Sequence, residues 1–230
     1  MPRRPAPSAS AERAASMDAP HLTLVLATRS AGKIRELRAL CAAAGIATQT
    51  LDEIGVVESP AEDALEVFET FEGNARAKAR HFAALLPGRW VLAEDSGLVV
   101  DALDGAPGVR SKRWTGSTAS GAALDAENNA ALLRALEGAA DRRARYVCVA
   151  VLRRGAEERV REGRVEGRIT EAPRGNGGFG YDPYFESEEL GCTFAEAAPE
   201  EKARVSHRGR AVRAILEGVK AEMGDGRRET

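Results

Sequence analysis

The sequence predicts an α/β fold with one mixed sheet, and two observations carry this prediction. First, an apolar run of strand length at 22–27 is followed by apolar residues at helical spacing over 31–44 and by a second strand-like run at 46–51. A strand–helix–strand unit of this kind usually opens an α/β domain. Second, two later runs flank Gly155 and predict a hairpin. No internal repeat or domain-scale linker divides the chain, so we expect one body with two lobes around a cleft.

The other elements are predicted from spacing and turn residues. Residues 52–65 are acidic and interrupted by Gly55 and Pro60, which favours a loop. A helix is predicted over 71–86, ended by Pro87-Gly88. The remaining predicted elements are two short strands at 90–93 and 98–102 around a tight Asp95-Ser96-Gly97 corner, a helix at 122–136, hairpin strands at 145–153 and 159–165, and a closing helix at 205–223.

Composition excludes several classes of protein. The formal charge of -2, from 33 basic and 35 acidic side chains, argues against a non-specific nucleic-acid binder, which is usually strongly basic. The three cysteines are scattered and form no C-x-x-C pair, so a disulfide scaffold or structural zinc site is not expected and a reducing, cytoplasmic setting is. The longest strongly apolar run, 146–152, is far too short to span a bilayer.

The two ends of the chain are predicted to be disordered. Residues 1–20 are rich in Ala, Ser, Pro and Arg, show no apolar periodicity and contain no hydrophobic region of the kind found in a signal peptide. Residues 224–230 are polar and charged. A single folded domain is therefore expected over 21–223.

The most informative stretch is the glycine-rich segment 170–185, which places four glycines between Arg174 and Tyr181. Glycine lets backbone N–H groups approach an anion closely. Phe179 and Tyr181 offer a ring face for a flat base, and Asp182 offers a carboxylate to read a donor on the base edge. These residues describe a nucleotide pocket, although a glycine-rich hairpin tip on an ordinary surface has the same composition.

Four further polar clusters suit the same ligand. The first, Thr28-Arg29-Ser30-Ala31-Gly32-Lys33, lies between the first strand and first helix, where free N–H groups and the helix dipole favour phosphate. It is not a Walker A loop, because Ala27 and Ile34 occupy the positions that need Gly and Ser or Thr. In the second cluster Asn74 and Lys78 are four residues apart and share one helix face.

The third cluster is acidic. Adjacent Glu94 and Asp95 before a glycine corner suggest a Mg²⁺ and water-handling site, because magnesium takes one or two carboxylates and leaves its other positions to water and phosphate. Each of these clusters also has a plain structural explanation as a capped helix, a solvated helix face or a surface turn.

A fourth cluster precedes the closing helix. Lys202 is followed by Ser206, a good N-cap residue, and then by His207 and Arg208. Cations are disfavoured in the first turn of a helix, so this local conflict points to function.

With these residues in place, the chain resembles the inosine triphosphate pyrophosphatase family of house-cleaning enzymes. Five blocks match in family order, and together they span nearly everything but the tails, roughly residues 22 to 220: 26–37, 70–79, 94–111, 177–185 and 201–211. The resemblance implies an elongated mixed α/β fold with a central cleft, a homodimer, and Mg²⁺-dependent hydrolysis of ITP, dITP and XTP to monophosphate and diphosphate.

The resemblance also implies residue roles. Asp95 matches the catalytic carboxylate and a metal ligand, and Glu66 matches the second metal carboxylate. The positions that match substrate contacts are Thr28, Arg29, Ser30, Ala31, Gly32, Lys33, Ser96, Phe179, Gly180, Tyr181, Asp182, Lys202, His207 and Arg208, to which we add Asn74 and Lys78. The family usually has Gly-Asn at Arg29-Ser30 and Glu-Thr-Gly at Glu66-Val67-Phe68, so these are departures.

The resulting hypothesis has Mg²⁺ held by Asp95 and Glu66, with Lys33 and Lys78 spreading the charge of the triphosphate. Asp95 also orients or deprotonates the attacking water. Base choice is expected from His207 or Arg208 donating to a keto oxygen. Two alternatives stay open: a pyrophosphatase for modified pyrimidine nucleotides, and a non-catalytic nucleotide- or RNA-binding module, suggested by the basic residues of 206–210 and by Arg29.

Overall fold

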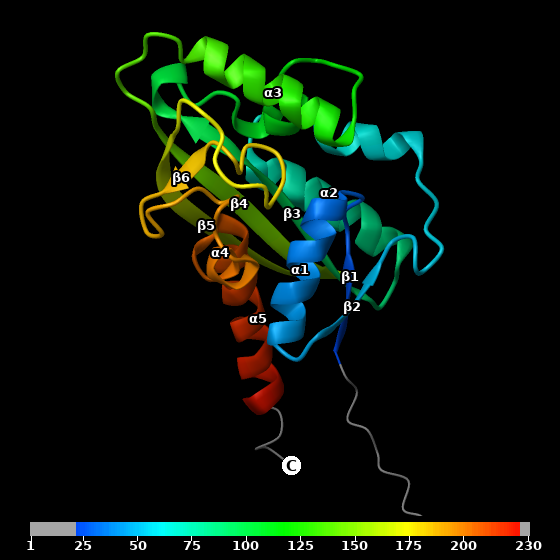
Figure 1. Ribbon diagram of the computed structural model, residues 1–230. Helices are drawn as coiled ribbons and strands as arrows, with labels where there is room; N and C mark the ends of the chain where they lie inside the picture. The colour runs from blue at the N-terminus through cyan, green and yellow to red at the C-terminus, as the bar shows by residue number, and fades with distance from the viewer. Residues whose placement is uncertain (1–21, 226–230) are drawn as a thin grey trace, which may run out of the picture.

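The computed structural model describes residues 22–225 and contains one six-stranded mixed sheet in the order β2-β1-β3-β4-β5-β6 (Figure 1). β1 is parallel to both β2 and β3, whereas the pairs from β3 to β6 are antiparallel. The prediction of a mixed α/β sheet is therefore confirmed. The strands are β1 (Thr23–Leu26), β2 (Ala47–Thr50), β3 (Trp90–Val100), β4 (Arg143–Arg154), β5 (Glu157–Ile169) and β6 (Phe185–Ser187).

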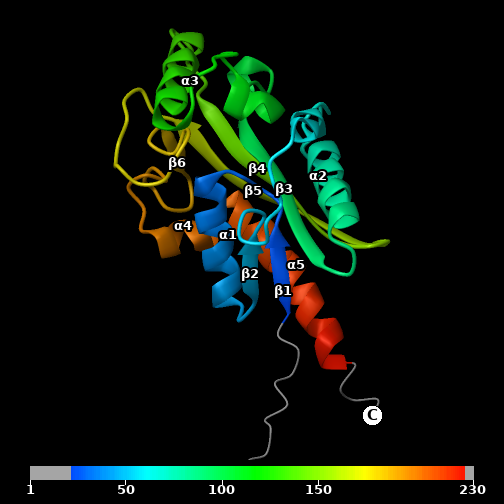
Figure 2. The ribbon, with the colours of Figure 1, turned by 90° about the vertical axis from the view of Figure 1, so that its right-hand side faces the viewer.

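Helices cover both faces of the parallel part of the sheet, because alternate side chains of β1 and β3 are apolar on both sides. Leu24 and Leu92 join the core under α1 and α5, and Val25 and Val91 join the core under α2. Figure 2 shows α1, α2 and α5 around β1 and β3. The helices are α1 (Ala31–Ala43), α2 (Phe71–Leu85), α3 (Gly121–Ala135), α4 (Pro199–Val205) and α5 (His207–Asp225).

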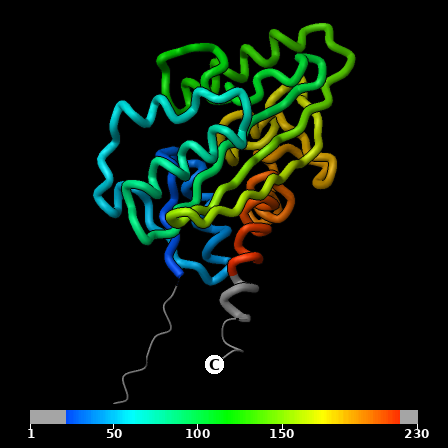
Figure 3. The backbone as a smooth tube through the Cα atoms, turned by 180° about the vertical axis from the view of Figure 1, so that it is seen from behind, coloured from blue at the N-terminus to red at the C-terminus, as the bar shows by residue number. Residues whose placement is uncertain are grey.

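A third core forms a second lobe at the far end of the long strands. The tube view shows β3 to β5 running diagonally from the lobe where the described chain begins and ends to the lobe that carries α3 (Figure 3). Leu132 and Leu136 from the α3 region pack there with Phe185 and Phe194, and with Val100 at the end of β3. Because β3 and β4 contribute to all three cores, the two lobes are held on one continuous sheet.

Three local predictions differ from the structure. The predicted corner at Asp95-Ser96-Gly97 is wrong: β3 continues from Trp90 to Val100, because every residue of this stretch pairs with β4 from Val91 onward. The loop predicted for 52–65 contains a short 3-10 helix, η1 (Pro60–Leu65), which Pro60 begins. The closing helix begins at His207, two residues later than predicted, and it is preceded by a short helix, α4, that was not predicted; the extended backbone of Ser206 (φ -63°, ψ 153°) separates the two.

Other boundaries agree within one or two residues for α1, α2 and α3, and the predicted hairpin is present with longer strands. The tail predicted for 1–20 lies outside the described residues, as does most of the end predicted for 224–230, although α5 continues to Asp225. Within 22–225 no helix combines the length and apolar character needed to cross a membrane.

Substitution of Gly163 in β5 tests the close packing of this strand against α5. A Cβ added at Gly163 would lie 2.2 Å from the backbone oxygen of His207 and 2.6 Å from the amide nitrogen of Ala211. Gly163→Ala is therefore expected to lower the free energy of unfolding by about 1–3 kcal/mol, measured by urea denaturation. The control is Gly218→Ala in α5, where an added Cβ would have nothing within 4 Å. This variant is expected to be neutral or up to ~1 kcal/mol more stable. Equal effects at the two positions would contradict this account.

Candidate functional site

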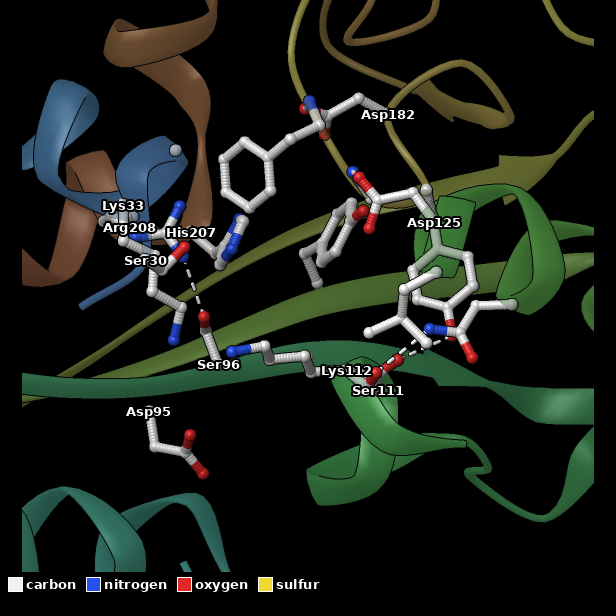
Figure 4. Close-up of a pocket in the computed structure, with 18 of the residues that line it drawn as sticks. Ser30, Lys33, Asp95, Ser96, Ser111, Lys112, Asp125, Asp182, His207 and Arg208 are labelled. Atoms are coloured by element: carbon white, nitrogen blue, oxygen red, sulfur yellow. Dashed lines mark hydrogen bonds between the residues drawn. The ribbon is translucent and has the colours of Figure 1, made fainter. Parts of the chain in front are cut away.

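A cavity of about 350 Å³ lies where six separate segments meet between the lobes. Its walls come from the start of α1, the centre of β3, the 3-10 helix η3 (Gly108–Arg113), α3, the glycine-rich loop and the α4–α5 junction (Figure 4). Asp95 and Phe179, 84 positions apart in the sequence, both line it. The expectation that the acidic strand and the glycine-rich loop share one cavity is therefore confirmed.

Glycine in α1 allows the glycine-rich loop to close one side of the cavity. A Cβ at Gly32 would lie 2.7 Å from Cδ1 of Phe179, so only glycine lets the ring pack on the first turn of α1. Ser30 is the N-cap residue of α1, and its amide donates to Oγ1 of Thr28 at 3.2 Å. The first turn of α1 thus faces the cavity with free backbone donors.

Asp95 projects from β3 toward α2. Its Oδ2 accepts a 3.0 Å hydrogen bond from Nδ2 of Asn74, and its Oδ1 lies 3.4 Å from Nζ of Lys78. Nζ of Lys78 also donates to Oε1 of Glu66 at 2.8 Å, so one ammonium joins the two carboxylates. Burial raises the pKa of Asp95 above its usual range, against the opposing effect of Lys78. Glu66 differs: burial acts to raise its pKa, but Lys78 and its other cationic neighbours lower it to about 2.

Glu94 and Ser96 project to the other face of β3, toward α1 and α5. Figure 4 shows Asp95 and Ser96 on opposite sides of the β3 ribbon, as alternation along a strand requires. Oε1 of Glu94 lies 2.7 Å from Nζ of Lys33, and its Oε2 lies 3.5 Å from Nη2 of Arg208. The prediction that Glu94 and Asp95 form a joint acidic site is therefore wrong, because a continuous strand separates the two carboxylates.

An ion network connects the α4–α5 junction to α1. Nζ of Lys202 donates to Oδ2 of Asp182 at 2.6 Å and to Oε1 of Glu36 at 2.7 Å, and Glu36 also pairs with Arg208. Nη2 of Arg208 donates to Oγ of Ser96 at 2.8 Å. Glu36 was not predicted from the sequence, although its position one helical turn after Lys33 places it on the same face of α1. Lysine and arginine here are thus paired with carboxylates before any ligand arrives.

His207 stands in the cavity as a neutral ring. It is 4 % exposed and stacks on Tyr146 with 4.6 Å between the ring centroids. Burial and the neighbouring Arg208 lower the pKa of His207 well below its usual range. Ser206 caps α5 by accepting from the amide of Gly209 at 3.1 Å, as predicted. The expected conflict between two cations and the helix dipole is thus reduced, because one of them is uncharged.

The glycine-rich loop is fixed by side chains from α3. The amide of Gly180 donates to Oδ2 of Asp125 at 2.8 Å, and its carbonyl accepts from Nδ2 of Asn129 at 2.9 Å. Tyr181 is buried with its hydroxyl donating to the backbone oxygen of Ser111 at 2.8 Å, so Phe179 is the half-buried ring left at the cavity wall. Asp125, Asn129 and Tyr146 were missed because no motif marks them.

Most of the predicted site residues line the cavity, and four do not. Those that line the cavity are Ser30, Ala31, Gly32, Lys33, Glu66, Asp95, Ser96, Phe179, Gly180, Tyr181, Asp182, Lys202, His207 and Arg208. Asn74 and Lys78 lie behind Asp95, and Thr28 lies behind Ser30. Arg29 turns away from the cavity toward Glu62 and Asp52. Among the residues that the structure describes, no three His, Cys, Asp or Glu side chains gather into a metal cluster.

Known proteins resemble this chain over most of its length. The model of the Ham1 family matches residues 24–218. A dITP/XTP pyrophosphatase of Bordetella parapertussis is 47% identical over 86% of this chain and 91% of the relative, and one of Symbiobacterium thermophilum is 49% identical over 88% and 98%. A solved structure of a HAM1 protein from Coxiella burnetii aligns with a TM-score of 0.74 at 37% identity, covering 87% of this chain and 99% of that one.

The α3 contacts predict how the glycine-rich loop is ordered. In Asp125→Ala the amide of Gly180 loses its acceptor, so amide hydrogen exchange over 175–182, followed by mass spectrometry, is expected to become roughly 5- to 10-fold faster. Asp125→Asn keeps an acceptor oxygen and is expected to exchange within about twofold of the wild-type rate. An unchanged rate in Asp125→Ala would show that other contacts hold the loop.

Proposed function

The chain belongs to the Ham1 family, and on that premise we propose that it hydrolyses the non-standard purine nucleoside triphosphates ITP, dITP and XTP to the monophosphate and diphosphate. Two relatives at 47% and 49% identity carry the name dITP/XTP pyrophosphatase. The observation that carries the proposal is that one cavity is lined both by Asp95 and Lys33 and by Phe179 and Arg208. A triphosphate and a purine ring need these two kinds of surface in one space.

The start of α1 is suited to the triphosphate. Backbone N–H groups of a helix N-terminus attract anions, and Lys33 adds a positive charge there. Because Lys33 already pairs with buried Glu94, its ammonium is held in place before substrate binds. Donors fixed in advance stabilise developing negative charge without reorganising, which is the main task in phosphoryl chemistry.

Asp95 is suited to handle the attacking water. Asn74 and Lys78 fix both of its oxygens from behind, so the carboxylate keeps one orientation. Its raised pKa makes it a better proton acceptor than an ordinary aspartate. We assign Asp95 the role of orienting or deprotonating water for attack on the α-phosphorus, with diphosphate as leaving group.

The donor set fits Mg²⁺. Asp95 and Glu66 are hard oxygen donors brought to one place by their shared contact with Lys78, and magnesium needs only one or two protein carboxylates. When bound there, the ion would neutralise phosphate charge during the reaction. Glu66 stays ionised to low pH, with its pKa held at about 2, so it remains available as a ligand.

The part of the cavity wall formed by Phe179, His207 and Arg208 is suited to a keto-purine. Phe179 presents a ring face near cationic groups, with Nζ of Lys202 5.3 Å from its centroid. Arg208 and neutral His207 both carry N–H donors, and O6 of hypoxanthine or xanthine is an acceptor. Adenine has a donor at that position and would leave buried groups unpaired. Asp182 already accepts from Lys202 and from the amide of Phe179 at 2.7 Å, so we assign it to holding the loop as well as to the base edge.

We further propose that the protein acts as a homodimer in the cytoplasm on a small-molecule nucleotide, without nucleic acid. The family resemblance supports the dimer. The near-balanced charge of -2 supports the exclusion of a non-specific nucleic-acid partner.

Replacement of Asp95 tests the catalytic assignment. Asp95→Asn keeps the size of the side chain but removes the proton acceptor, so kcat for ITP is expected to fall by about 100-fold or more. Diphosphate release at saturating Mg²⁺ measures this, and circular dichroism checks that the fold is kept. A rate within a few fold of wild type would remove Asp95 from the reaction.

A substrate panel tests the proposed function as a whole. Diphosphate release is measured with ITP, dITP, XTP, GTP, ATP and modified UTP analogues, each with Mg²⁺ and with EDTA. We expect turnover of the first three, at least ~100-fold discrimination against ATP, and loss of activity in EDTA. Preference for the UTP analogues would favour a pyrimidine enzyme, and binding of ITP without product would favour a non-catalytic module.

A further inference from the structure

Arg29, predicted to contact phosphate, instead holds the segment between β2 and α2. Its Nε and Nη2 donate to the two carboxylate oxygens of Glu62 at 3.2 and 2.9 Å, a bidentate pair. Nη2 also donates to the backbone oxygen of Val56 at 2.9 Å, and Nη1 pairs with Asp52. Arg29 does not line the cavity, so all of these contacts point away from the substrate.

The held segment, residues 52–66, ends at Glu66. Glu62 lies in η1, accepts from the amide of Ser59 at 3.3 Å, and is followed four residues later by Glu66 at the C-cap of the same short helix. The position of Glu62 therefore sets where Glu66 leaves η1. From there Glu66 reaches Nζ of Lys78 at 2.8 Å, beside Asp95.

Few buried apolar side chains fix this segment. None of the residues of η1 is buried, and Val57 is 84% exposed. Ile54, Val56 and Leu65 are only partly buried against the neighbouring core. The side chains of Arg29 and Glu62 are much better shielded, at 20% and 14% exposed, so their bond is a shielded polar tie between the middle of the segment and the rest of the protein. At the end of the segment, Glu66 pairs with Lys78 at 2.8 Å and with Nη2 of Arg113 at 2.9 Å.

We infer that Arg29 is a positioning residue that sets Glu66 opposite Asp95 through Glu62, without touching substrate. The inference rests on the proposed role of Glu66 as a metal carboxylate. It assigns a function to the arginine at a position where the related family usually has glycine. Partners that orient a metal ligand typically change metal affinity or activity by about 10- to 100-fold when removed.

The experiment compares Arg29→Ala, Glu62→Gln, their double variant and Arg29→Lys with wild type. First, hydrogen exchange of peptides from 56–68 is measured without metal or nucleotide, and is expected to accelerate by about 10-fold in Arg29→Ala and Glu62→Gln. Second, the Mg²⁺ concentration for half-maximal ITP hydrolysis is expected to rise by about 10-fold in the same two variants, with KM for ITP at saturating Mg²⁺ changed less than about threefold. The double variant is expected to match the single ones, and Arg29→Lys to fall between because it loses the bidentate geometry.

The matched control is Arg38→Ala. Arg38 pairs with Glu53 of the same segment at 2.5 Å, but both side chains are more than 40% exposed and the pair lies at the far end from Glu66. It is expected to leave exchange over 56–68 and the Mg²⁺ requirement unchanged. Unchanged exchange in Arg29→Ala, or faster exchange with an unchanged Mg²⁺ requirement, would overturn the inference. A rise in KM for ITP in Arg29→Ala but not in Glu62→Gln would restore Arg29 as a substrate contact. If wild type hydrolyses none of the nucleotides, the proposed function fails, whereas the exchange measurement still decides whether Arg29 holds the segment.

Discussion

The structure depends on how β3 carries two consecutive carboxylates through the protein interior. Glu94 is 1% exposed and Asp95 is 6% exposed, and a buried charge without a partner is strongly destabilising. Because adjacent strand residues face opposite sides, each carboxylate needs cations from a different layer of helices. Lys33 and Arg208 meet Glu94 from α1 and α5, and Lys78 meets Asp95 from α2. These pairs fix both helical layers against two consecutive residues of the central strand.

The same pairs make the cavity ready for a highly charged ligand. From Asp182 through Lys202, Glu36 and Arg208 to Glu94, opposite charges alternate along a connected network. Each cation is held by protein carboxylates, so little side-chain ordering remains when a triphosphate binds. Charges buried between helices and sheet also act in a lower dielectric than water, which strengthens their interaction with phosphate.

Two contacts outside this ion network hold loops at the cavity, and neither contacts the ligand directly. On one side α3 holds both backbone groups of Gly180, which keeps Phe179 at the cavity wall. On the other side Arg29 and Glu62 hold the segment that delivers Glu66. Each of these contacts holds a loop, and each loop carries a residue to which we assign a function. A rigid sheet with separately tied loops is the usual way in which a fold positions a site.

By itself the sequence determined the order and type of most elements and the residues that chemistry would select. Apolar periodicity marks α1 and the hairpin, and the glycine spacing around Phe179 marks a ligand loop, because these signals are local. Only the tertiary structure decided which side chains contact one another. Continuous pairing with β4 extended β3 through the expected corner and sent Glu94 and Asp95 to opposite faces. Likewise Arg29 is next to Ser30 in sequence but bonds to Glu62, 33 positions away. Such long-range contacts leave no local pattern, because packing chooses among equally plausible local positions.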